Sequence, residues 1–337
     1  MNFVGIDLHK KTISICVVSQ ARQMLDRKRF YCSDPKRIAA FFEELRPFQA
    51  VVEATASYEW LFEFLEPLSE RMVLAHPKKL RVIAESTRKS DKLDAQVLAE
   101  FLAMDMIPQS HRPTPRQREH RVLVRHRFYI RRRQGGTRTK IRRILSNYNA
   151  DRPDLFTAKG LAYLKEVDVS AADRFVLDDL IDEWREFSRR LEAVEKELRS
   201  FAKKAPAQEA EARAALDTIP GVGAVTVDVV VSELGDVSRF RSQKRVCAYA
   251  GLAPGQRESA GRGKELGITK EGSRLLRWAL VEAAWRLIRF SKRWRTIFEG
   301  LAGRRGKKKA IVAVARRLLC VMVAMLQSGR RYRHAAV

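Results

Sequence analysis

Two apolar runs at the start of the chain constrain its fold more than any other feature. They span Phe3 to Leu8 and Thr12 to Val18, and the short polar stretch between them is typical of a turn, so "NFVGIDLHKKTISICVVS" predicts a β-hairpin. Asp7 lies inside the first run. A strand that reaches a core excludes a lone charge unless that charge is paired, binds a metal ion or does chemistry. Asp7 is therefore the first candidate functional residue.

The residues that follow alternate strand and helix patterns up to about residue 105. Strands are expected near 24–31, at 50–54 and at 71–76, and helices at about 34–45, 57–68 and 91–104. Hairpin strands followed by βαβ units predict a mixed sheet flanked by helices. The sequence thus predicts an α/β domain over residues 1–110.

Four acidic residues of this region are candidates for one site. Glu53 lies at the end of the strand "AVVEA", and a parallel or mixed sheet binds its ligands at this edge. Asp91 and Asp94 are three residues apart, so on a helix both project from one face. If they converge with Asp7, a cation must neutralise them, and carboxylates without Cys or His select Mg²⁺ or Mn²⁺. Simpler roles stay open for each residue alone: Asp91 as a helix cap, Asp94 as a surface acid, and Glu53 as the partner of a buried arginine.

The charge of the chain indicates a polyanionic partner. There are 66 Lys plus Arg against 40 Asp plus Glu, a net charge of +26, and nucleic acid is the first candidate. Residues 112–143 hold 13 Lys or Arg and one acid, in a helical pattern that we expect to break at Gly135 and Gly136. We interpret this stretch as a nucleic-acid backbone contact rather than a solvated helix face. The candidate contacts are Arg125, Arg131, Arg132 and Arg138.

Residues 111–210 are predicted to form a basic helical linker and coiled-coil region. Eight apolar residues between Leu177 and Phe201 alternate at spacings of three and four, which is a heptad seam. The seam favours a coiled coil that joins two copies of the chain, and packing within one chain is the alternative of equal weight.

Residues 211–337 are predicted to form a mainly helical domain. The segment "IPGVG" (219–223) indicates a helix-hairpin-helix in which Gly221 and Gly223 let backbone N–H groups approach a phosphate, although a Pro-Gly turn also joins helices that touch no DNA. Residues 286–333 hold 15 Lys or Arg and one acid, and "GRRGKKK" (303–309) predicts a flexible basic loop that contacts RNA or DNA, with a solubilising tail as the alternative.

The remaining composition favours a reducing cytoplasm. The four cysteines are scattered without a CxxC pair, which predicts neither a zinc site nor a disulfide framework. The longest apolar run, 310–326, is interrupted by Arg316 and Arg317 and so predicts a buried amphipathic helix rather than a membrane span.

Several stretches, in this order, resemble the DEDD transposases of bacterial insertion sequences, the family described as bridge-RNA-guided recombinases. They are "GIDLHKKTISICV", "VVEATASYEWL", "HPKKLRVIAESTRKSDKLDAQVLAEFL" and "YAGLAPGQRESAGRGKELGITKEGSRLLRWALVEAA". The resemblance implies an RuvC-like, RNase H-like domain whose four metal-binding acids are Asp7, Glu53, Asp91 and Asp94. It also implies a second domain with a catalytic serine, which Ser259 matches, although Ser259-Ala260-Gly261 departs from the expected Ser-Gly or Ser-Ser-Gly.

The same resemblance implies the chemistry and the partners. Ser259 would attack a DNA phosphate and become linked to the strand end, and a structured guide RNA would pair with donor and target DNA. The acidic site of one subunit would face the serine of another in a homodimer or homotetramer. The segment "GQRESAGRGKELG" is Gly-rich and basic, suited to holding phosphate. The candidate nucleic-acid contacts around it are Arg262, Lys264, Lys270 and Arg277.

Three other interpretations stay open. A plain RuvC-like nuclease would hydrolyse DNA with metal-activated water, and a non-catalytic architectural protein would use only the basic helices. The segment "GIDLHKKT" also loosely resembles the first phosphate loop of actin-like sugar kinases, but the sequence shows no second nucleotide motif.

Overall fold

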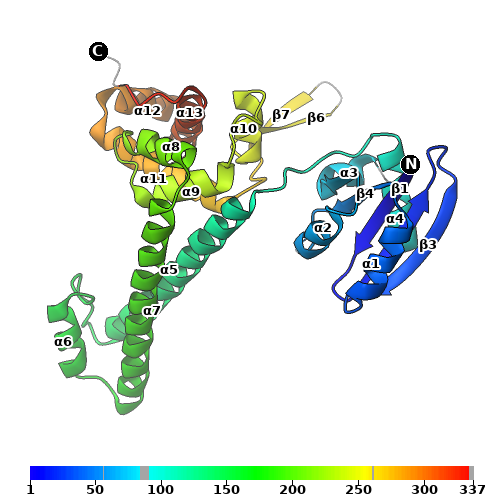
Figure 1. The fold of residues 1–337 in the computed structure, drawn as a ribbon. Helices are drawn as coiled ribbons and strands as arrows, with labels where there is room; N and C mark the ends of the chain where they lie inside the picture. The colour runs from blue at the N-terminus through cyan, green and yellow to red at the C-terminus, as the bar shows by residue number, and fades with distance from the viewer. Residues whose placement is uncertain (56, 84–90, 260–261, 334–337) are drawn as a thin grey trace. The chain divides into compact units, whose positions relative to one another are not determined.

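The computed structural model describes residues 1–337 except 56, 84–90, 260–261 and 334–337. For residues 81–83, 91–94, 256–259 and 262–265 it describes the backbone alone. The contacts divide the chain into two compact units, Met1–Arg112 and Pro113–Val337 (Figure 1). The further division expected near residue 210 stays a prediction.

The first unit is a five-stranded sheet with helices. Its elements are β1 (Asn2–Leu8), β2 (Thr12–Val18), β3 (Met24–Tyr31), α1 (Pro35–Glu44), β4 (Phe48–Glu53), α2 (Glu59–Leu65), β5 (Arg71–Ala75), α3 (Pro77–Ile83) and α4 (Asp91–Ala103). The strand order is β3-β2-β1-β4-β5. Pairs β1–β2 and β2–β3 are antiparallel, whereas β1–β4 and β4–β5 are parallel. The expected mixed sheet and its strands are confirmed.

The alternation of side chains along β1 assigns one helical layer to each face of the sheet. Val4, Ile6 and Leu8 belong to one buried cluster with residues of α1 and α2. Phe3 belongs to a second cluster with residues of α4. Since side chains along a strand alternate between faces, Gly5 and Asp7 share the face of Phe3, which α4 covers.

The second unit consists of helices and one hairpin. Its elements are α5 (Pro115–Asn147), α6 (Ala158–Glu166), α7 (Ala171–Lys203), α8 (Ala207–Asp217), α9 (Ala224–Leu234), α10 (Gln243–Tyr249), β6 (Pro254–Ser259), β7 (Arg262–Ile268), α11 (Arg274–Phe290), α12 (Lys292–Arg305) and α13 (Lys307–Ser328). One large apolar core joins α8 to α13.

Helix α13 is the one helix of the described residues that is long and apolar enough to cross a membrane by length and composition. Half of its most apolar window is buried within the protein. Leu318, Leu319 and Met322 have no exposed surface in the core that α13 shares with α9 and α11. This packing is that of a core helix, as the sequence predicts.

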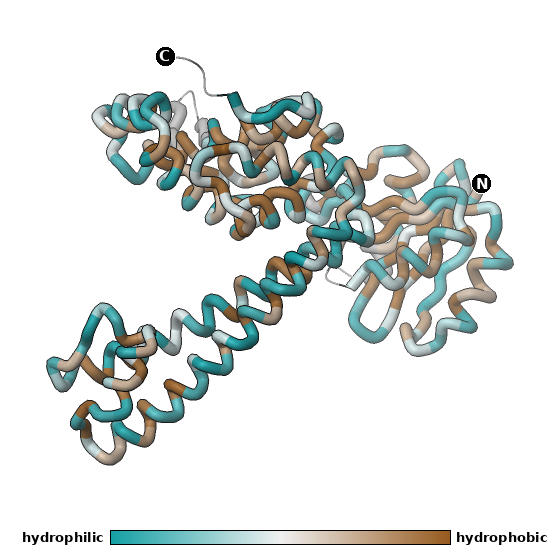
Figure 2. Tube along the Cα trace, turned by 60° about the vertical axis from the view of Figure 1, so that its left-hand side comes forward, coloured by the Kyte–Doolittle hydropathy of each residue, from teal (hydrophilic) through white to brown (hydrophobic). Residues whose placement is uncertain are grey.

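Helices α5 and α7 lie side by side as a two-helix arm (Figures 1 and 2). Helix α5 runs without interruption through Gly135 and Gly136, so the predicted break is wrong. No atom lies within 4 Å of the position of a Cβ at either glycine, outside the helix's own nearby backbone. The cost of two helical glycines, about 1 kcal/mol each, is offset by the packing of α5 on α7.

The heptad seam of α7 is buried within its own chain. Leu177 and Leu180 pack with Ile141 and Leu145 of α5, and Phe187 and Val194 pack with Ile130 of the same helix. The expectation that this seam joins two copies is therefore wrong, and the alternative of packing within one chain is observed.

Two Gly-rich basic segments contain regular elements, and the flexible loop predicted for "GRRGKKK" is wrong. "GQRESAGRGKELG" contributes to the antiparallel β6–β7 hairpin, in which Ser259 pairs with Arg262. "GRRGKKK" spans the end of α12 and the start of α13, with Gly306 alone between them at φ +79°.

Candidate active site and nucleic-acid interface

The candidate active site begins where β1 and β4 end. Ile6 pairs with Val52 in the parallel register, so the next residues, Asp7 and Glu53, stand at the carboxyl ends of neighbouring strands. The Asp7 side chain is 16% exposed, and its Oδ2 lies 3.0 Å from Nε2 of His9. Two carboxylates and one imidazole are thus assigned to one edge of the sheet.

Helix α4 runs antiparallel to β1 on the shared face. Near the start of β1, Arg22 donates a hydrogen bond to the Met104 sulfur, and halfway along, Arg27 donates one to Gln96. Arg27 pairs with Cys16, which pairs with Gly5. The helix residues that precede Gln96 therefore continue toward the end of β1, where Asp7 stands.

Gly5 allows this close approach. A Cβ at Gly5 would lie 2.0 Å from the carbonyl oxygen of Ala95 and 2.5 Å from the amide nitrogen of Ala99. These distances are far below van der Waals contact, so only glycine lets the α4 backbone rest on β1. Ala95 directly follows Asp94. The contact therefore fixes the first turn of α4, with Asp91 and Asp94, beside the carboxyl end of β1.

The side chains of Asp91 and Asp94 lie outside the described part of the structure. Among the side chains that it does describe, no three His, Cys, Asp or Glu residues form a metal-binding group. The donors described at this edge, Asp7 and Glu53, are carboxylates, which suit a hard divalent cation such as Mg²⁺ or Mn²⁺. The backbone arrangement and the donor type fit such an ion.

His9 is a site residue that sequence reasoning missed. It lies two residues after Asp7, and its backbone N–H donates to Thr12 in the hairpin turn. The signal was the spacing of "DLH", since residues i and i+2 of an extended segment project to the same side. A histidine beside a carboxylate can hold or move a proton at that carboxylate.

Ser259 ends β6, in the second unit. Its side chain lies outside the described residues, as do the side chains of Arg262 and Lys264. The backbone places Ser259 and Arg262 opposite each other at the end of the hairpin. Lys270 follows the hairpin, is exposed and has a positive φ of 57°.

Several candidate cation contacts are used inside the protein. Arg125 forms an ion pair of 3.1 Å with Glu233, whose side chain is 3% exposed. Arg277 donates hydrogen bonds to the carbonyl oxygens of Ala250, Glu271 and Gly272, and burial lowers the pKa of its guanidinium. These two arginines have structural roles that sequence alone did not reveal.

The arginines of the arm are placed differently. Arg131 donates to Gln134, and Arg138 lies over the ring of Phe156 at 4.4 Å. Burial and the neighbouring cations Arg131 and Arg142 lower the pKa of Arg138. Arg132 is exposed and makes no hydrogen bond or ion pair with the described residues. Of the four predicted contacts on α5, Arg132 is the most available to a ligand.

The two glycines of "IPGVG" differ in their surroundings. Gly221 has φ +79°, and a Cβ there would lie 2.7 Å from the Cβ of Arg286 in α11. Gly223 precedes α9 and has no atom within 4 Å of a Cβ position. Gly221 is thus explained by packing, and of the two glycines Gly223 alone has open space around it.

An ion-pair network joins α5 to α8 and α9. Glu209 accepts hydrogen bonds from Arg116 and Arg213, and Arg213 also contacts Asp228, which lies 3.0 Å from His120. Burial raises the pKa of Glu209, but the hydrogen bonds from the two arginines outweigh it and leave the pKa below its ordinary value of 4.5. The network stabilises the junction of the arm with the helical core.

Comparison with known families matches both units of the chain. Residues 4–150 match a profile of DEDD transposases of the IS110 type, and residues 213–299 match the transposase IS116/IS110/IS902 family. The five-stranded mixed sheet and the acids at its edge are consistent with the RNase H-like domain of such enzymes. The fold and these matches define an enzyme that acts on DNA by transposition or recombination.

Relatives with known designations span nearly all of the chain. A transposase for insertion sequence element IS1111A of Coxiella burnetii is 25% identical, covering 100% of this chain and 92% of the relative. A transposase for insertion sequence element IS1328 of Yersinia enterocolitica is 25% identical over 84% and 83%. A pilin gene-inverting protein of Moraxella bovis is 25% identical over 98% and 97%. The chain is thus similar to transposases of the IS116/IS110/IS902 family over residues 213–299 and to DEDD transposases over residues 4–150.

Proposed function

We propose that the protein cuts and rejoins DNA through a serine-linked intermediate, with a divalent cation held by Asp7, Glu53, Asp91 and Asp94. The observation that carries the proposal is the arrangement at the sheet edge. Asp7 and Glu53 follow paired residues of β1 and β4, and Gly5 admits α4 against β1. When bound, a divalent ion would offset the repulsion of these carboxylates and the charge that develops on the scissile phosphate.

Ser259 is the proposed nucleophile. Its hydroxyl oxygen forms a bond to phosphorus, and the hydroxyl proton passes to a base. The bond from phosphorus to one deoxyribose oxygen breaks, and this oxygen takes up a proton and leaves as a DNA hydroxyl. In rejoining, a DNA hydroxyl attacks the phosphoserine and releases Ser259 unchanged. The number of high-energy bonds is conserved, so the reaction needs no external energy source.

The base in this scheme is a residue of the acidic site. His9 Nε2 at 3.0 Å from Asp7 can accept a proton at the acidic site. The acids lie in the first unit and Ser259 in the second, so the scheme requires the two sites to meet on one DNA phosphate. We propose that they meet between subunits of a homodimer or homotetramer, which must assemble by a face other than the buried heptad seam.

A structured guide RNA is proposed as the source of target choice. The support is the resemblance of the chain to the guided family and the basic α5, on which Arg132 is exposed. Pairing of RNA with donor and target DNA would supply sequence specificity that phosphate contacts alone do not carry.

The test uses purified full-length protein, Mg²⁺, DNA that carries the element end and its target, and the RNA transcribed beside the gene. We expect a covalent protein–DNA adduct and a recombinant product. Asp7→Asn should remove both while leaving the fold and DNA binding intact. Asp26→Asn, the same change on a residue of β3 whose side chain is 39% exposed, is the matched control and should retain activity.

Ser259→Ala separates this proposal from a hydrolytic nuclease. The variant should form no adduct and should not cut, whereas a nuclease that uses water would still cut DNA. Ser146→Ala on exposed α5 is the control for loss of a hydroxyl. Cleavage by Ser259→Ala would reject the serine mechanism and favour metal-activated water.

DNA inversion is a second candidate outcome of the same chemistry. Pilin gene-inverting proteins of Moraxella bovis and Moraxella lacunata match 98% of this chain at 25% identity. A substrate with two sites in inverted orientation distinguishes the outcomes, because inversion reverses the orientation of the DNA between them while insertion adds DNA.

A further inference from the structure

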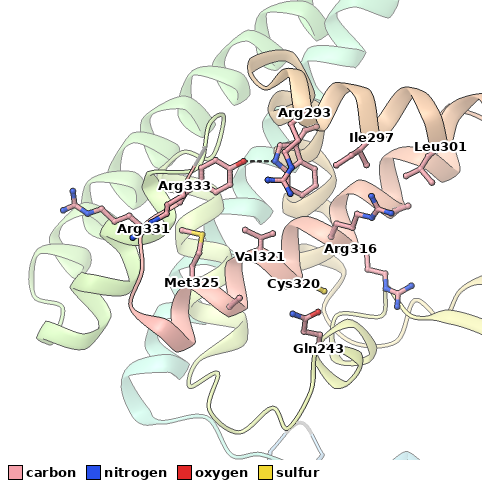
Figure 3. Close-up of a pocket in the computed structure, with 15 residues that line it drawn as sticks. Gln243, Arg293, Ile297, Leu301, Arg316, Cys320, Val321, Met325, Arg331 and Arg333 are labelled. Carbon is pink, nitrogen blue, oxygen red and sulfur yellow. Dashed lines mark hydrogen bonds between the residues drawn. The ribbon is translucent and has the colours of Figure 1, made fainter. Parts of the chain in front are cut away.

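A cavity in the second unit is lined by charged side chains that the catalytic proposal does not use. It has a volume of about 750 Å³ and lies among α12, α13, the start of α10 and the segment after α13 (Figure 3). Its lining contains five arginines and no acidic residue. The arginines are Arg293, Arg316, Arg317, Arg331 and Arg333. We call this cavity the arginine pocket.

The five guanidinium groups make no hydrogen bond or ion pair with residues that the structure describes. Elsewhere in the chain arginines are often matched to acids, as in the pairs of Arg127 with Glu195 and Arg116 with Glu209. Five like charges around one cavity repel one another unless an anion enters. The pocket therefore has the electrostatics of an anion-binding site.

The floor of the pocket is apolar and aromatic. Ile297 and Leu301 line it from α12 and Val321 lines it from α13 (Figure 3). Tyr332 adds a partly buried aromatic ring, and Trp294 and Met325 reach the pocket with 5% and 6% of their surface exposed. An inorganic anion or a sugar phosphate would leave this surface uncovered. A ligand that carries both an apolar planar face and a phosphate would cover it.

The wall that carries Arg331 and Arg333 is held in place by the residue between them. The hydroxyl of Tyr332 accepts a hydrogen bond of 2.8 Å from Nε1 of Trp294, and its backbone N–H donates to the hydroxyl of Thr218 at 2.9 Å. These bonds fix the segment after α13 to α12 and to the end of α8. The pocket is thus shaped before a ligand binds, which lowers the entropic cost of binding.

Cys320 also lines the pocket. Burial and the adjacent Cys247 thiol, 3.6 Å away, raise the pKa of Cys320 to about 11. The thiol is therefore neutral at physiological pH and adds no negative charge among the arginines.

We propose that the arginine pocket takes up one unstacked nucleotide of a DNA strand, with the base on the apolar floor and the adjacent phosphates on the arginines. Base-paired nucleotides are stacked and cannot enter a cavity, so the pocket would select unpaired DNA of the kind that strand exchange creates. The inference rests on DNA being the substrate, as the family indicates, and not on the identity of the catalytic residues.

The test is equilibrium binding of the full-length protein to a strand of eight thymidines and to the same strand without bases. Wild-type protein should bind the thymidine strand about tenfold more tightly, the effect of about one base stacked on an aromatic side chain. Ala324→Phe, at an exposed lining position of α13, should remove this preference and leave binding of the base-free strand unchanged. Equal binding of both strands by wild type, or a preference that survives Ala324→Phe, would overturn the proposal.

Charge is tested separately with matched double variants. Arg316→Gln with Arg331→Gln should weaken binding of both strands, whereas Arg37→Gln with Arg199→Gln removes the same charge from exposed positions outside the pocket and should have a smaller effect. Equal effects of the two pairs would contradict a pocket and indicate general attraction to the basic surface. Circular dichroism of each variant verifies folding.

Two further ligands test whether the pocket prefers a DNA strand, a free nucleotide or RNA. Free thymidine monophosphate that competes as well as the strand would assign the pocket to a small molecule, and a preference for RNA of the same length would assign it to RNA. Either result would reject the proposal. Asp7→Asn should bind the strands like wild type, so loss of catalysis and loss of pocket binding are separate outcomes.

Discussion

Gly5→Ala is expected to disable the acidic site without touching any acid. The added Cβ would lie 2.0 Å from the carbonyl oxygen of Ala95, and ordinary contact requires 3.4 Å, so α4 must move away from β1 by about 1.4 Å. The colliding atoms are backbone, so no rotamer change relieves the clash. Overpacking of this kind costs about 1–3 kcal/mol of the free energy of unfolding. A misplacement of about 1 Å at a reacting group can lower the rate about 100-fold.

The assay combines urea unfolding with the rate of strand cleavage. Gly135→Ala is the matched control because no atom surrounds its Cβ position, and in the middle of α5 it should stabilise the protein by about 0.5–1 kcal/mol. Cleavage by Gly135→Ala should be unchanged. If Gly5→Ala cleaves DNA at the wild-type rate, the argument that this contact positions Asp91 and Asp94 is wrong.

Three further predictions concern charged residues. Asp7→Asn should keep the melting temperature within a few degrees and abolish cleavage, measured on the same preparation; retained cleavage contradicts its role. Arg125→Ala leaves buried Glu233 without its ion pair and should lower the free energy of unfolding by about 1–3 kcal/mol. Arg132→Ala should change the free energy of unfolding by less than about 0.5 kcal/mol. It should also weaken nucleic-acid binding in a salt-dependent way. Because the folded pKa of Glu209 lies below its ordinary value of 4.5, its stabilisation is complete above that pH and is lost as pH falls through the folded pKa. Glu209→Gln should therefore flatten the loss of stability in acid, and an unchanged pH profile would contradict this assignment.

The N-terminal fold was predictable because its signals are local. Short runs of strand-forming residues predict β1 to β5, and Asp34 caps α1 by accepting a hydrogen bond from the Arg37 N–H. The positions of Asp7 and Glu53 near the ends of two strands were likewise predictable from the apolar runs, and the structure makes these strands neighbours. The Gly5 contact was not predictable, because the approach of α4 to β1 depends on tertiary packing between residues about 90 positions apart.

The second unit shows where local patterns mislead. Gly135 and Gly136 indicated a helix break, but packing on α7 overrides helix propensity. The heptad seam correctly predicted a helix at α7. It could not predict what packs against that helix, since α5 and a second copy of the chain would offer a similar apolar surface. Similarly, a count of positive charges cannot distinguish Arg125, which is paired with a buried acid, from Arg132, which is not.

The length of the arm limits how its nucleic-acid contacts can be spaced. Helices α5 and α7 each have 33 residues, so each is about 50 Å long. One turn of duplex DNA is about 35 Å. Contacts made at the two ends of α5 therefore cannot fall within the same turn of a straight duplex. Changing the length of the arm by whole helical turns in both helices should therefore shift the spacing between the nucleic-acid segments that the protein can bind at once.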